Sequence, residues 1–143
     1  MIKTFRGRMA PSSQDLIRLS TNNGLTGYKI NKLQIITAAP GTATATEFVV
    51  KVYTREQDST TGTIDFSDGL LLAVAYETDD TTPSNPAGQI IIFDNMKFNQ
   101  DIFVTAVDNS AGSSDVNYYL ELEQFKLSTD EAAVAILKDM RGN

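Results

Sequence analysis

Acidic side chains are the best candidates for catalytic groups in this chain, judged by residue type and spacing. The sequence holds no histidine and no cysteine, so the commonest general base, the thiolate nucleophile and the commonest transition-metal ligands are absent. Glu121 and Glu123 lie two residues apart, and paired carboxylates are the groups that hydrolyse glycosidic bonds. They alternate with apolar residues, however, which places them more simply on the solvent side of a strand. We therefore predict no catalytic residues and no enzyme activity.

Two segments rich in carboxylates are candidate calcium sites. Residues 108–115 have the sequence D-N-S-A-G-S-S-D, and Glu77, Asp79 and Asp80 follow the most apolar run. Calcium binds such oxygen ligands, but the spacing is not that of an EF-hand and the bidentate glutamate is missing. Asp and Asn are also common in turns, because their side chains bond to nearby backbone. We predict solvated turns with no metal, no cofactor and no small-molecule ligand, and calcium binding is the alternative.

The charges are divided unevenly along the sequence. The net charge is −6, yet residues 1–32 hold six basic side chains against one acidic one, and the remainder holds six against 17. Such a division predicts two differently charged surfaces, with chance clustering as the alternative. An acidic body repels phosphate, so we predict no nucleic-acid partner.

The length of 143 residues fits one domain. The start, M-I-K-T-F-R-G-R, lacks the apolar stretch of a signal peptide. The most apolar run, residues 70–76, is too short to span a bilayer. We therefore expect synthesis in a cytoplasm and no membrane partner.

The C-terminal part has the clearest local pattern. Apolar residues alternate with polar ones over residues 116–122, as in a half-buried strand. Ser128 with Glu131 forms a capping box that opens a helix at about residues 129–140. The apolar stripe predicted for this helix has helical spacing and comprises Ala133, Ile136, Leu137 and Met140.

The rest of the chain has the pattern of strands and turns. Apolar positions change parity between Ile30 and Leu33, which predicts a β-bulge near Asn31 and Lys32. About eight short, evenly spaced strands predict an all-β fold, a single antiparallel β-sandwich over residues 1–143, with one short C-terminal helix. A jelly roll is the first choice and an immunoglobulin-like Greek key the second. Residues 1–27 are predicted to be a basic, partly extended N-terminal segment.

Several segments together resemble small structural proteins of tailed phages, particularly marine ones. They are M-I-K-T-F-R-G-R-M, S-T-N-N-G-L-T-G-Y-K-I-N-K-L-Q-I, I-D-F-S-D-G-L-L-L-A-V-A-Y, I-I-I-F-D-N-M-K-F-N-Q-D-I-F-V-T-A-V-D and Y-Y-L-E-L-E-Q-F-K-L-S. The resemblance spans nearly the whole chain and implies a virion component, most plausibly a capsid decoration or cement protein with a jelly-roll body. It transfers no site residues, and it leaves open a head or a tail location.

The expected partner is the major capsid protein or another virion protein. If the basic segment docks on the shell, the candidate contacts combine apolar anchors with cations, namely Ile2, Lys3, Phe5, Arg6, Arg8 and Met9. Residues 70–76 are apolar on both faces, which either a covered central strand or a subunit contact would explain. We expect a homo-oligomer. The alternative function is a lectin-like, carbohydrate- or receptor-binding module, with Tyr53 and Tyr119 as exposed aromatic platforms.

Overall fold

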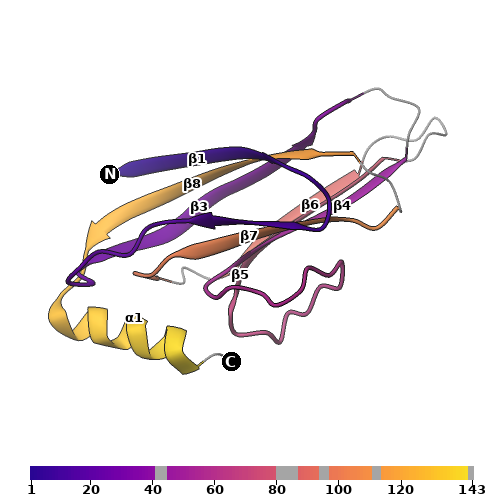
Figure 1. Ribbon diagram of the computed structural model, residues 1–143. Helices are drawn as coiled ribbons and strands as arrows, with labels where there is room; N and C mark the ends of the chain where they lie inside the picture. Colours follow the sequence, from indigo (N-terminus) through magenta and orange to yellow (C-terminus); the bar gives the residue numbers. More distant parts are fainter. Residues whose placement is uncertain (41–44, 80–86, 94–96, 111–113, 142–143) are drawn as a thin grey trace.

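A computed structural model describes residues 1–40, 45–79, 87–93, 97–110 and 114–141. In these residues the chain forms eight strands and one helix (Figure 1). In chain order they are β1 (Ile2–Met9), β2 (Ser13–Ile17), β3 (Thr26–Thr37), β4 (Thr46–Tyr53), β5 (Leu71–Asp79), β6 (Ala87–Ile92), β7 (Ile102–Asp108), β8 (Val116–Lys126) and α1 (Thr129–Arg141).

The strands form two antiparallel sheets. One sheet has the order β1-β8-β3, and the other has the order β2-β7-β4-β5-β6. The predicted all-β fold with one C-terminal helix is thereby confirmed. The inward-facing side chains of both sheets meet in one main hydrophobic core, for example Phe48 and Val50 of β4 with Leu120 and Leu122 of β8.

The position of β6 decides how closely the strand order approaches a jelly roll. In an eight-stranded jelly roll, β6 would complete the sheet of β1, β8 and β3. Here β6 pairs with β5 instead, at the edge of the other sheet. Phe98 lies beside β3 and exchanges two backbone hydrogen bonds with Tyr28, of 2.8 and 2.9 Å. The jelly-roll assignment therefore stays a prediction.

The apolar run at residues 70–76 lies mostly in β5, a central strand of the five-stranded sheet. Its outer face is covered by residues 54–70, the magenta segment beneath this sheet in Figure 1. Lys51 is buried under this segment, and its Nζ donates to the Thr63 carbonyl at 2.7 Å. Tyr53 is buried in the same place, so its prediction as an exposed aromatic platform is wrong. The covered-strand interpretation explains the apolar run, because both faces of β5 are packed.

The β-bulge in β3 is confirmed. The pairing of β3 with β8 shifts between Ile30 and Lys32. One extra residue, Asn31, lets Ile30 and Leu33 both face the core despite their opposite parity.

The helix begins as predicted but packs on a different side. The Glu131 N–H donates to Ser128 Oγ at 3.1 Å, and the Ser128 N–H donates to Glu131 Oε1 at 3.2 Å. The hydrogen bond from the Ser128 backbone N–H to the carboxylate lowers the pKa of Glu131. Ala132 and Ala135 face the body, whereas Leu137 is 56% exposed.

The predicted stripe is therefore wrong for Ala133 and Leu137, which face solvent, and the Met140 side chain lies outside the described residues. The reason is a contact between the helix and Asn99, a residue distant from it in the sequence. Buried Asn99 donates through Nδ2 to the carbonyls of Gly24, at 2.9 Å, and Ala132, at 3.4 Å. This contact brings the alanine side of α1 against the sandwich, where small side chains allow a close approach.

Candidate binding face

The solvent side of the three-stranded sheet presents outward side chains from β1, β8 and β3. Strand register aligns its outward side chains in rows, because opposed residues on neighbouring strands point to the same side. One row joins Arg6, Tyr119 and Gln34, and the next joins Arg8, Asn117 and Ile36. Ile36 is 62% exposed. We call this surface, residues 6, 8, 34, 36, 117 and 119, the open face.

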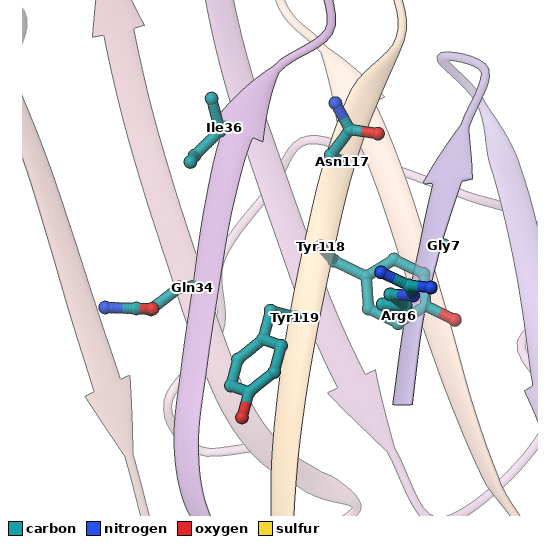
Figure 2. Close-up of a pocket in the computed structure, with 7 residues that line it drawn as sticks. All are labelled: Arg6, Gly7, Gln34, Ile36, Asn117, Tyr118 and Tyr119. Carbon is teal, nitrogen blue, oxygen red and sulfur yellow. The ribbon is translucent and has the colours of Figure 1, made fainter. Parts of the chain in front are cut away.

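A groove of about 480 Å³ runs across this face. Figure 2 shows that β1, β8 and β3 all contribute to its lining. Tyr119 is half-buried, and its hydroxyl donates to Glu121 Oε1 at 3.5 Å. The groove therefore combines an aromatic ring and an aliphatic side chain with amide and guanidinium groups. Its lining residues are Arg6, Gly7, Gln34, Ile36, Asn117, Tyr118 and Tyr119.

Tyr118 forms the floor of the groove and joins the two sheets. A Cβ atom on Gly7 would lie 2.8 Å from Tyr118 Cε1, so the ring packs directly against the backbone of β1. The Tyr118 hydroxyl donates to Asp15 Oδ2 of β2, in the other sheet, at 3.5 Å. Burial and the neighbouring Asp15 carboxylate raise the pKa of Tyr118 to about 12. The floor is thus neutral at physiological pH, and it is held by packing.

Acidic residues in β8 and directly before it lie between the basic residues of β1 and β3. Arg8 Nε lies 2.8 Å from Asp115 Oδ2, and Lys29 Nζ lies 3.2 Å from Glu123 Oε2. β8 lies between the two basic strands, and these ion pairs neutralise their charge in part. The division into two differently charged surfaces stays a prediction. Arg6 makes no ion pair with any described residue. Arg6 lines the groove, and its guanidinium can therefore bind a ligand there.

The six predicted contact residues lie in β1 or at its end, but they do not form one surface. Ile2, Lys3, Arg6 and Arg8 are exposed, and Phe5 is half-buried against the core. Met9 is 2% exposed and belongs to the core itself, so it is no contact for a partner. The N-terminal segment is extended, as β1 and β2, and each of these strands is hydrogen-bonded into a sheet.

Sequence reasoning missed Gln34, Ile36 and Asn117 as members of the open face. A signal for Ile36 was present, because it breaks the alternation of β3 by following the inward-facing Ile35. Gln34 and Asn117 are ordinary outward polar residues, and only the strand order brings them beside Arg6 and Tyr119.

The candidate calcium loops have other bonds where the structure describes them. Asp108 Oδ1 accepts hydrogen bonds from the N–H groups of Glu47 and Ser110, each at 3.0 Å, and Asp115 is paired with Arg8. The described residues contain no group of three or more acidic side chains that could hold a metal ion. Asp80, the Asp79 side chain and residues 111–113 lie outside the described residues.

Within the described part of the chain, α1 is too short and too polar to cross a bilayer. Comparison of the sequence and structure with protein-family models, with curated proteins and with solved structures found no match.

Proposed function

We propose that this chain is a structural virion protein of a tailed phage, a capsid decoration protein that binds the shell of the major capsid protein through its open face. The observation that supports a docking role is the groove, where exposed Ile36 lies near Tyr119 and Arg6, a cation without an ion pair among the described residues. Arginine and aromatic residues are enriched in protein interfaces. The virion context rests on the resemblance of the framework segments to phage structural proteins.

The geometry favours a rigid docking surface. Ordering a free arm costs roughly 1–2 kcal/mol per residue in backbone entropy, but β1 is already fixed along its whole length by β8. Apolar contact through Ile36 and Tyr119 then supplies most of the affinity. Exposed charges are screened within about 8 Å at physiological salt, so Arg6 mainly steers encounter and register.

A protein that binds only the assembled shell stabilises it by mass action. This is the decoration activity that we propose, and it needs no catalytic group. The finer fold assignment, a jelly roll, belongs to the same proposal. It is supported by the order β2-β7-β4-β5 opposite β1-β8-β3, and by the pairing of Phe98 with β3.

Carbohydrate binding is the second candidate, and the same groove favours it. A Tyr119 ring beside the planar polar groups of Arg6, Gln34 and Asn117 can stack on a sugar and bond its hydroxyls. The two candidates thus compete for one surface and differ in the partner that occupies it.

The test is direct binding of the full chain to purified phage particles or capsid shells, beside retention on immobilised glycans. The decoration proposal expects co-sedimentation with shells and no glycan retention. Arg6→Gln should slow association and weaken its salt dependence, whereas Arg8→Gln should have less effect because Arg8 is already bonded to Asp115. Glycan retention without shell binding would replace the proposal by the lectin-like function, and no binding to either would overturn both.

A further inference from the structure

Strand β6 is an edge strand with exposed isoleucines on both faces. Ile90 is 46% exposed and lies opposite Ala75, whose side chain is in the core. Ile91 is 37% exposed and lies opposite Val74 on the outer side of the sheet. Phe66 and Ile64 extend this outer patch across a shallow groove of about 230 Å³. Exposed apolar residues thus lie on both sides of one strand.

The other sheet edges carry charges that discourage pairing with another strand. Four strands lie at sheet edges in the part of the chain that the structure describes. β1 contains Lys3, Arg6 and Arg8, β2 contains Asp15, and β3 contains Lys29 and Lys32. Natural proteins protect edge strands with such charges. The sequence of β6, A-G-Q-I-I-I, has none.

The backbone of β6 has polar groups available on its outer side. The Phe93 N–H donates to the Leu72 carbonyl at 3.0 Å, towards β5. Backbone groups alternate in direction along an antiparallel strand, so the N–H and C=O groups of Ile90 and Ile92 point away from β5. No described strand pairs with this side of β6.

We propose that β6 pairs with β6 of a second copy of this chain, antiparallel across a two-fold axis centred on Ile90. In this register Ile90 faces Ile90 of the partner copy, and Gly88 faces Ile92, so the outward backbone groups of both strands are satisfied. Gln89 faces Ile91 across the outer side. The two five-stranded sheets join into one continuous sheet, in which the two Ile90 side chains cover each other and each Ile91 packs beside Gln89 of the other copy.

The uncharged edge suits pairing with a second copy of this chain. Each chain has a net charge of −6, so two copies repel one another at most surfaces. An edge without charges is a surface where this repulsion is weakest, and antiparallel pairing of identical strands is self-complementary, as a two-fold interface requires. The proposed contact uses the β6 edge of the five-stranded sheet. The open face of the three-stranded sheet stays free for a shell or a glycan.

The experiment measures the mass of the full chain in solution by sedimentation equilibrium over a wide concentration range. The wild type should approach the mass of two chains, and Ile90→Lys should have the mass of one. Ile36→Lys is the matched control, because it places the same charge at an exposed isoleucine of the open face, and it should remain a dimer. A wild type with the mass of one chain at every concentration, or a dimer that tolerates Ile90→Lys, would overturn the proposal.

Hydrogen exchange on the wild type gives a second readout that needs no variant. The Ile90 amide should exchange slowly in the dimer and faster on dilution, whereas the Ile91 amide, which points to β5, should stay slow at both concentrations. An Ile90 amide whose exchange does not depend on concentration would contradict the pairing. Neither measurement contains a shell or a glycan, so the outcome is separate from that of the proposed function.

Discussion

Replacement of Met9 by alanine tests whether the N-terminal strand belongs to the sandwich or is a detachable arm. Met9 is 2% exposed and lies opposite buried Val116 in the core. The substitution removes three side-chain heavy atoms, each worth about 0.8 kcal/mol of transfer free energy, and adds the cost of the cavity left behind. We expect a loss of about 2–5 kcal/mol in the free energy of unfolding.

The assay is urea denaturation at neutral pH, followed by circular dichroism. Ile2→Ala is the matched control on the same strand, because Ile2 is exposed, and it should cost about 0.5 kcal/mol or less. If both variants lose the same small amount of unfolding free energy, then β1 is not packed into the core. The same reasoning predicts that deletion of residues 1–9 destabilises the whole domain, because it removes an eight-residue strand from the edge of β8.

Three further predictions concern the helix and the groove floor. Ser128→Ala should cost about 1 kcal/mol of unfolding free energy in urea denaturation, because it removes the N-cap, and an unchanged midpoint would mean that the cap is unused. Leu137→Ala should cost about 0.5 kcal/mol or less, since Leu137 faces solvent; a loss near 3 kcal/mol would place it in a packed interface. Raising the pH from 10 towards 12 ionises Tyr118 first in the unfolded chain, because its folded pKa is about 12 against 10.0. The unfolding free energy of the wild type should therefore fall by about 2 kcal/mol more than that of Tyr118→Phe over this range, and equal decreases would contradict the raised pKa.

Features set by neighbouring residues could be predicted from the sequence. The parity change between Ile30 and Leu33 located the bulge, and the spacing of Ser128 and Glu131 located the helix start. Both depend on backbone geometry within a few residues. The two-sheet architecture followed from the number and spacing of the strands.

Features set by strand order could not be predicted in this way. The basic residues of β1 and β3 are neutralised in part by β8, which lies between them but comes some 80 residues after β3 in the chain. Tyr53 has an outward position in β4, yet residues 54–70 cover it. The side of α1 that packs depends on Asn99 and Gly24, which no helical periodicity reveals.

The most direct test of the central claim is a comparison of shell binding by the wild type, Ile36→Lys and Ser59→Lys. Ile36 is an exposed residue of the open face, and Ser59 is an exposed residue of the segment that covers the opposite sheet. Both variants add one positive charge. We predict that wild type and Ser59→Lys co-sediment alike with capsid shells. Ile36→Lys should bind about tenfold more weakly or worse, a loss of at least about 1.4 kcal/mol. Equal binding by all three proteins, or no binding by the wild type, would contradict the account.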